Sequence, residues 1–262
     1  MGVVNLTPDS FSDGGRYLEP AQALERALTL EAEGAAILDL GGESTRPGAA
    51  AVSEQEELRR VLPVLEQLRP RTRAILSIDT SKPEVMHAAA AAGADLINDV
   101  NALRAPGALQ AAAASGCAVC LMHMQGEPRT MQHAPHYEDV VLEVRAFLAE
   151  RVRACRAAGI ADARILLDPG FGFGKTLEHN LTLLRRFEAL RIEGLPLLAG
   201  LSRKSMIGTI TGKQSQARVH GSVAAALIAA QNGAQILRVH DVAATVDALK
   251  VLAAVMVGSE GG

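Results

Sequence analysis

Short apolar runs with strand character alternate with longer stretches of helical periodicity along the whole chain. The runs are apolar at successive positions rather than at every second one, which is typical of parallel strands covered on both faces. Eight strand–helix units in 262 residues predict an α/β fold, a single (β/α)8 TIM barrel whose one domain spans residues 1–262. A doubly wound open sheet is the alternative. The predicted strands cover residues 1–5, 36–40, 74–79, 95–99, 117–123, 164–168, 196–200 and 235–240.

The stretches between these runs carry helix signals. Residues 20–33 place the apolar side chains Leu24, Ala27, Leu28 and Ala32 on one stripe and end before Gly34. Ser53 with Glu56 three residues later is a capping-box pattern, so we expect a helix over residues 53–68. Further helices are expected over residues 81–93, 137–158 and 216–231.

Composition and charge exclude several classes of protein. Hydrophobic residues make up 48% of the chain but aromatic residues only 3%, which favours an aliphatic core of helices packed on a sheet. A net charge of −3 argues against a nucleic-acid-binding protein held by phosphate contacts. No apolar run reaches the length of a membrane span, and no secretory signal opens the chain, so we expect a cytoplasmic protein without membrane partners. Cys117 and Cys120 are spaced like a metal or redox pair, but residues three apart on a strand face opposite ways, which predicts two buried thiols.

Polar residues stand at the carboxyl end of nearly every predicted strand. In a barrel these ends meet at one face, where the βα loops converge and active sites form. Each residue alone could be a helix cap. Together they predict a site, and they are Asn5, Asp39, Asp79, Asn98, His123, Asp168, Ser202 and His240.

Two loops rich in glycine, hydroxyl and charged residues follow the first and second strands, at residues 5–15 and 41–48. We expect them to close over an anionic substrate, with long surface turns as the alternative reading. Asn5 stands at the end of the first strand, where its amide oxygen could bind a hard cation such as Mg²⁺.

The segment 168–176 contains three alternate glycines and ends in Gly-Lys-Thr. Its spacing fits neither a P-loop nor a dinucleotide fingerprint. The glycines instead predict a backbone that passes close to a flat ligand, with Phe171 and Phe173 presenting ring faces to it.

The last two strands are followed by residues suited to anions. Ser205 opens a predicted helix, whose amino terminus favours a carboxylate. Arg238 and His240 fall on the same side of the eighth strand and could clamp phosphate oxygens. The alternative is a surface arginine and a capping serine.

Three residues predicted to be buried suit one edge of a heterocycle. The carboxylates of Asp79 and Asp168 accept hydrogen bonds from an amino-pyrimidinone edge, and the Asn98 amide satisfies donors and acceptors alike. Lys204 could donate to a ring carbonyl or nitrogen.

Eight motifs then follow one another nearly from end to end: NLTPDSFSDGG at 5–15, GGESTRPGA at 41–49, IDTSKPEV at 78–85, IND at 97–99, LMHMQG at 121–126, LLDPGFGFGK at 166–175, GLSRKSMIG at 200–208 and RVHDV at 238–242. In this order they resemble the dihydropteroate synthases. Members of that family usually carry a short segment ahead of the first strand, whereas here the strand begins at Met1.

The resemblance implies a role for each matching residue. Pterin would be bound by Asp79, Asn98, Met122, Asp168, Phe173, Gly200 and Lys204. p-Aminobenzoate, and sulfonamides in its place, would meet Phe11, Thr45, Arg46, Pro47, Phe173 and Ser205. Pyrophosphate would meet Thr45, Arg238 and His240, with Mg²⁺ on Asn5. The catalytic set would be Asp79, Asp168, Lys204, Arg238 and His240.

The resemblance also implies a transferase of folate biosynthesis. It would join 6-hydroxymethyl-7,8-dihydropterin pyrophosphate to p-aminobenzoate by a carbocation-like route, and it would act as a homodimer. Two alternatives remain at this point: a corrinoid-dependent methyltransferase on a pterin-binding barrel, and a pterin-binding paralogue without activity. The Ser-Arg-Lys and Arg-Val-His motifs disfavour the first, and the intact polar set disfavours the second.

Overall fold

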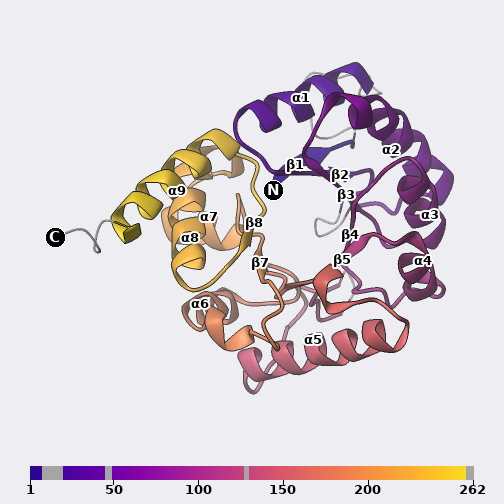
Figure 1. Cartoon of the computed structure of the whole chain (residues 1–262). Coiled ribbons are helices and arrows are strands. Elements are labelled where there is room, and N and C mark those ends of the chain that lie inside the picture. The colour runs from indigo at the N-terminus through magenta and orange to yellow at the C-terminus, as the bar shows by residue number, and fades with distance from the viewer. Residues whose placement is uncertain (8–19, 45–48, 127–129, 258–262) are drawn as a thin grey trace.

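A computed structural model describes residues 1–7, 20–44, 49–126 and 130–257. Its strands form a ring at the centre of the molecule, and its helices surround the ring (Figure 1). The strands are β1 Gly2–Asn5, β2 Ile37–Gly41, β3 Ile75–Asp79, β4 Leu96–Asp99, β5 Ala118–Met122, β6 Ile165–Asp168, β7 Leu198–Ala199 and β8 Ile236–Leu237. The helices are α1 Pro20–Ala32, α2 Glu54–Leu68, α3 Pro83–Ala91, α4 Ala108–Ser115, α5 Val140–Ala157, α6 Leu177–Arg185, α7 Ser205–Thr211, α8 Val219–Gln231 and α9 Val242–Val257.

Every strand pairing is parallel, in chain order. Strands β1 to β6 form one sheet, and β7 pairs with β8. Single bridges from Leu167 to Leu197 and from Gly2 to Val239 join these two sheets at both edges. The pairing therefore runs around the whole ring, which confirms the barrel and rules out the open sheet.

The predicted elements differ from the observed ones mainly late in the chain. Strands β7 and β8 have two paired residues each, whereas the apolar runs predicted five and six. Helices α4, α6 and α9 were not among the predicted helix ranges, and the alanine-rich sequence of α4 offers little contrast between a buried and an exposed face. At the start of α2 the Ser53 hydroxyl accepts the Glu56 N–H at 3.2 Å, but the Glu56 carboxylate pairs with Arg59 and Arg60. The cap is thus confirmed, and its reciprocal half is not formed.

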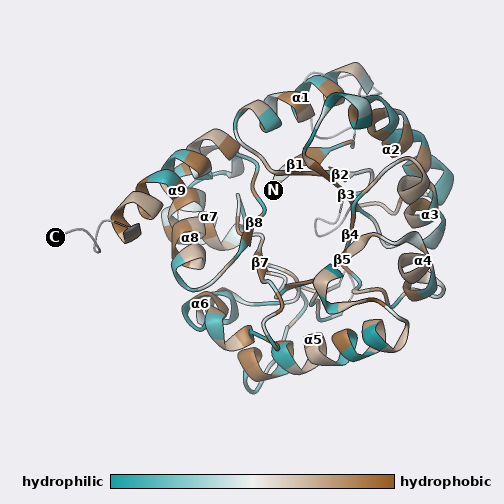
Figure 2. Ribbon diagram, in the orientation of Figure 1, coloured by the Kyte–Doolittle hydropathy of each residue, from teal (hydrophilic) through white to brown (hydrophobic). Residues whose placement is uncertain are grey.

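The core has two shells. Leu, Val, Ile and Ala side chains pack between the outer faces of the strands and the helices. Hydrophobic residues, drawn in brown, lie on the central strands and alternate with hydrophilic ones along the surrounding helices (Figure 2). Inside the ring, a smaller apolar cluster contains Ile37, Leu96, Cys120 and Leu198. Cys120 faces this inner cluster and Cys117 packs in the outer shell, both as buried free thiols, as predicted.

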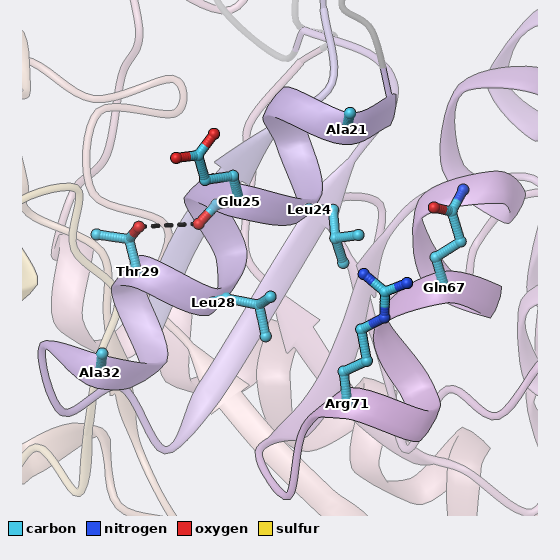
Figure 3. A pocket seen from close by; sticks show the side chains of 8 residues that line it. All are labelled: Ala21, Leu24, Glu25, Leu28, Thr29, Ala32, Gln67 and Arg71. Atoms are coloured by element: carbon cyan, nitrogen blue, oxygen red, sulfur yellow. Dashed lines mark hydrogen bonds between the residues drawn. The ribbon is translucent and has the colours of Figure 1, made fainter.

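The outer surface carries a shallow groove between α1 and the end of α2 (Figure 3). Leu24 and Leu28 form its apolar wall, and Arg71 lies opposite them. The predicted site residues described by the structure are not among those that line this groove. No helix in the described part of the chain is long and apolar enough to cross a bilayer.

Candidate active site

The inner face of the ring changes from apolar to polar toward the carboxyl ends of the strands. Side chains alternate along a strand, so a residue two positions after an inward apolar side chain also points inward. Asp39 follows Ile37 in this way, and Asn98 follows Leu96. The upper inward layer consists of Asp39, Asp79, Asn98, Met122 and Asp168, all of them buried.

One arginine holds two carboxylates of this layer together. Arg238, directly after β8, places Nε 2.6 Å from Asp39 Oδ2 and Nη2 2.8 Å from Asp79 Oδ2. The Asp39 carboxylate is fully buried and also accepts hydrogen bonds from Ser77, at 2.6 Å, and from Asn98. A carboxylate without water must have such partners, because an unpaired buried charge costs several kcal/mol. Arg238 thus spans the ring and aligns the carboxylates of β2 and β3.

The electrostatics of the layer favour a ligand that brings hydrogen-bond donors. Burial, aided by Asp39, raises the pKa of Asp79 to about 7, and the Arg238 guanidinium opposes that shift. Burial also raises the pKa of Asp168, against the hydrogen bond from the Gly170 N–H at 2.7 Å. Both shifts reflect carboxylates that have lost water, so a donor-rich or cationic ligand would restore what burial removed.

Glycines stand beside two of these carboxylates. A Cβ added at Gly200 would lie 3.9 Å from Asp168 Oδ2, and one added at Gly41 would lie 3.8 Å from Asp79 Oδ2. Gly200, predicted as a pterin contact, thus borders the Asp168 carboxylate. Neither glycine adds side-chain atoms beside the carboxylate next to it.

The loops after β6 and β7 form a wall beside the carboxylates. Phe173 packs with Met122, Met124 and Met131 in a small cluster, and the Lys204 Nζ lies 4.2 Å from the centre of the Phe173 ring. Phe173, Met122 and Lys204 are thus brought together as predicted, and a ring with an adjacent ammonium group suits a flat polar ligand.

Phe171 corrects the prediction made for the same loop. Its side chain is 1% exposed and belongs to the outer core, where it stacks on Phe187 at 6.0 Å between centroids. The direction of the chain in this glycine-rich loop sends alternate rings to opposite sides. Of these two rings, the one that faces the site is Phe173.

The two residues predicted to clamp phosphate lie at different depths. Arg238 is engaged with the buried carboxylates, whereas His240 lies two residues farther on, with Nδ1 3.1 Å from the Ser202 hydroxyl. Ser205 is exposed at the first position of α7. Arg203 makes a bidentate contact with Asp241, which ties the loop after β7 to the loop after β8.

Contacts with Lys82 and with α2 hold the start of the loop that follows β2 in place. Lys82 donates hydrogen bonds to both Glu43 and the fully buried Glu57 of α2. A Cβ at Gly42 would meet Glu57 Cγ and Val61 Cγ2 at 2.9 Å, so only glycine lets the chain pass this close to α2. The predicted residues Phe11, Thr45, Arg46 and Pro47 lie outside the described residues.

The side chains available as metal ligands suit a metal ion that arrives bound to the substrate better than one that the protein holds by itself. In the described ranges no three His, Cys, Asp or Glu side chains gather as a metal site. Asn5, half-buried at the end of β1, offers one amide oxygen beside Gly41. Mg²⁺ commonly takes only one or two protein ligands when phosphates supply others. Asn5 therefore fits that use.

Two residues of the site had no role predicted for them. Asp39 was predicted only as one of the polar residues at the strand ends, although a carboxylate within an apolar strand must find a buried partner. Lys175 is 3% exposed beneath the loop after β6 and reaches His123, which was singled out only as a strand-end residue. No local pattern separates Lys175 from a surface lysine.

Comparison with known proteins agrees with this arrangement. The family described as pterin binding enzyme matches residues 1–240. The dihydropteroate synthase of Escherichia coli K12 is 53% identical over 260 residues, which cover 99% of this chain and 92% of the relative.

Solved structures show the same relationship. A dihydropteroate synthase from Yersinia pestis, solved with a sulfonamide drug complex, has a TM-score of 0.94 and 54% identity and covers 98% of this chain and 93% of its own. The enzyme from Xanthomonas albilineans with 4-aminobenzoic acid has a TM-score of 0.92 and 58% identity over 97% of this chain and 92% of its own.

Proposed function

The chain belongs to the dihydropteroate synthases, a family of pterin binding enzymes, and from this premise we propose how its own residues carry out the reaction. The reaction joins 6-hydroxymethyl-7,8-dihydropterin pyrophosphate to p-aminobenzoate and releases pyrophosphate. The observation that carries our account is the layer of buried carboxylates at the strand ends, bordered by Phe173 and Lys204.

The pterin ring enters edge first over the carboxylate layer. Asp168 and Asp79 accept its N–H donors, and Asn98 meets the neighbouring polar atom of the pyrimidinone edge. Lys204 donates to a ring acceptor, and Met122 with Phe173 packs on the ring faces. The raised pKa of Asp79 and of Asp168 supports this placement, because each carboxylate regains donors that burial removed.

The pyrophosphate lies above the ring, at the rim of the barrel. His240 and Arg238 stand at successive depths after β8 and supply donors to it, with Thr45 of the second loop. Asn5 would hold a Mg²⁺ ion carried by the pyrophosphate. Such an ion, when bound, supplies positive charge that stabilises the leaving oxygens.

Bond breaking precedes bond making in this proposal. The C–O bond between the pterin CH₂ and the pyrophosphate breaks, and its electron pair leaves with the pyrophosphate. Positive charge then spreads from the CH₂ into the pterin ring, where Asp79 and Asp168 stabilise it. The amino nitrogen of p-aminobenzoate attacks the CH₂ and gives up one proton to the released pyrophosphate, which completes the C–N bond without a side-chain nucleophile.

The second substrate approaches from the outer side of Phe173. Ser205, exposed at the start of α7, would donate to its carboxylate, and Phe11, Arg46 and Pro47 would complete the subsite. A sulfonamide presents a similar aromatic amine and would compete for the same place. The relatives solved with 4-aminobenzoic acid and with a sulfonamide support this assignment.

We also propose a cytoplasmic homodimer. Cys117, Cys120 and Cys155 are buried free thiols, which suits a reducing compartment. Exposed apolar side chains stand on the last two helices, Ile228 on α8 and Val251, Val255 and Met256 on α9. Sedimentation of the protein at micromolar concentration should give twice the 27.5 kDa chain mass, and a monomer would contradict the dimer.

One experiment tests the function itself. Purified protein is given the dihydropterin pyrophosphate with and without p-aminobenzoate, and pyrophosphate and dihydropteroate are measured. The proposal expects matched amounts of both products only when p-aminobenzoate is present. Methyl transfer to a corrinoid protein would identify the methyltransferase, and pterin binding without turnover would identify the inactive paralogue.

A further inference from the structure

A lysine is buried under the loop that joins β6 to α6. The Lys175 Nζ lies 2.9 Å from the Gly170 carbonyl oxygen, 3.0 Å from that of Phe173 and 3.4 Å from that of His123. It also lies 2.9 Å from Nδ1 of the His123 ring. Its side chain is therefore surrounded by acceptors from two consecutive strand ends.

The groups around the Lys175 amine are hydrogen-bond acceptors, so they favour the form of the amine that has the most N–H donors. Burial lowers the pKa of His123 to about 2, so its ring is neutral and Nδ1 can accept a hydrogen bond from Lys175. Burial lowers the pKa of Lys175 to about 7, while the nearby Asp168 carboxylate acts in the opposite direction. An ammonium group has three N–H donors, one more than the neutral amine, and so satisfies more of these acceptors.

The loop above Lys175 crosses the end of β5 at very short range. A Cβ at Gly170 would lie 2.0 Å from the His123 carbonyl oxygen, and a Cβ at Gly174 would lie 2.4 Å from that of Gln125. Both glycines have positive φ angles, 67° and 61°. The loop can therefore descend onto β5, but such glycines do not by themselves favour one conformation, because they are the most permissive residues.

The same carbonyl groups lead directly to the ligand wall. Phe173, whose carbonyl oxygen Lys175 binds, carries the ring that lies under the Lys204 ammonium at 4.2 Å. Gly170, whose carbonyl oxygen Lys175 also binds, donates its N–H to Asp168 at 2.7 Å. Each of these two contacts joins Lys175 to a residue of the proposed pterin site.

We propose that Lys175 is a positioning residue, a buried hydrogen-bond donor that restrains the glycine-rich loop and so holds Phe173 and Asp168 in place for the pterin ring. It acts through these two residues, because its Nζ is enclosed by protein acceptors and does not face the ligand. The inference rests on the proposed function, since it needs pterin at this wall.

The test replaces Lys175 by methionine, which keeps the length of the side chain and removes the charge and donors. We expect binding of 6-hydroxymethylpterin, followed by calorimetry, to weaken about tenfold or more. The KM for p-aminobenzoate at saturating pterin should rise less than the pterin dissociation constant does, because of the two positioned residues only Phe173 borders that substrate. The matched control is Lys250→Met on exposed α9, which should change neither value. Unchanged pterin binding in Lys175→Met, or an equal loss for both substrates, would overturn the proposal.

A double-mutant cycle separates positioning from simple loss of stability. If Lys175 acts largely through Phe173, then Lys175→Met should weaken pterin binding much less in a Phe173→Ala background than in the wild type. Fully additive losses would contradict the proposal.

If Lys175→Met does not fold, Lys175→Gln provides a second test, because it retains two donors. It should weaken pterin binding about threefold, and wild-type affinity in this variant would also contradict the proposal. Failure of the wild-type protein to bind the pterin at all would instead count against the proposed function.

Discussion

The strand ends of β2 to β4 and the loops after β6 and β7 both contribute to the same site, but they position their side chains by different means. Asp39, Asp79 and Asn98 sit on strands whose register fixes their height, and Arg238 links the two carboxylates. Phe173 sits on a loop of permissive glycines and depends on a buried lysine beneath it. Groups carried by a sheet need charge pairing to remain buried, whereas groups carried by a loop need added restraint to remain in one place.

The largest effect is expected when the carboxylates carried by β2 and β3 lose the arginine that pairs with both of them. Arg238→Met leaves the Asp39 and Asp79 carboxylates without their shared cation, and breaking a buried pair in this way costs about 3 kcal/mol of unfolding free energy. Urea denaturation followed by circular dichroism measures the loss. A change below about 1 kcal/mol would mean that Arg238 does not hold this side together.

Much of this comparison could be anticipated from the sequence. Apolar runs and intervening helical periods predicted the barrel, and strand-end polarity predicted Asp79, Asn98 and Asp168, because both depend on local patterns. Arg238 was predicted on the correct strand end but not with its partners Asp39 and Asp79. Those contacts join residues far apart in the chain, across a ring that only the fold creates.

The orientations of the side chains in the loop after β6 were harder to predict for a related reason. Phe171 and Phe173 stand two apart in a glycine-rich segment, and nothing local tells which ring faces the core. In the structure Phe171 packs in the outer core and Phe173 packs beside the site, on a loop whose glycines have positive φ angles. Composition alone also gave Lys175 no distinction from an exposed lysine, since its burial follows from how the loop descends onto β5.

A smaller effect should appear in the pH dependence of stability. The pKa of Asp79 rises to about 7 in the folded protein, from 3.8, so the folded state binds more protons than the unfolded state between these values. Its contribution to stability is fully present below pH 3.8 and is lost as the pH rises through 7. Asp79→Asn should therefore flatten the fall in unfolding free energy between about pH 4 and pH 7.

Thermal or urea melts of wild type and Asp79→Asn across that pH range provide the measurement. An Asp95→Asn variant serves as a control, because Asp95 pairs with Arg69 near the opposite ends of the strands. Parallel curves for wild type and Asp79→Asn would show that the Asp79 carboxylate gains no protons on folding.

The smallest effect is expected at the outer edge of the site, where α7 begins. Ser205→Ala removes one exposed donor at the start of α7, so the KM for p-aminobenzoate should rise about threefold to tenfold, as expected for one solvent-exposed hydrogen bond. The KM for the pterin substrate should stay within about twofold. Steady-state kinetics with each substrate varied in turn would show this split, and equal effects on both would remove Ser205 from the subsite.

We propose that the buried carboxylates act on the positive charge that develops in the pterin, beyond merely holding the ring. Asp168→Asn keeps the size and most hydrogen bonds of the side chain and removes its charge. The direct measurement compares kcat, from pyrophosphate release, with the dissociation constant of 6-hydroxymethylpterin in wild type and in this variant. We predict that kcat falls about 100-fold while the dissociation constant rises less than about tenfold, because the charge is needed most in the transition state. A near-normal kcat, or a loss of binding as large as the loss of kcat, would contradict the claim.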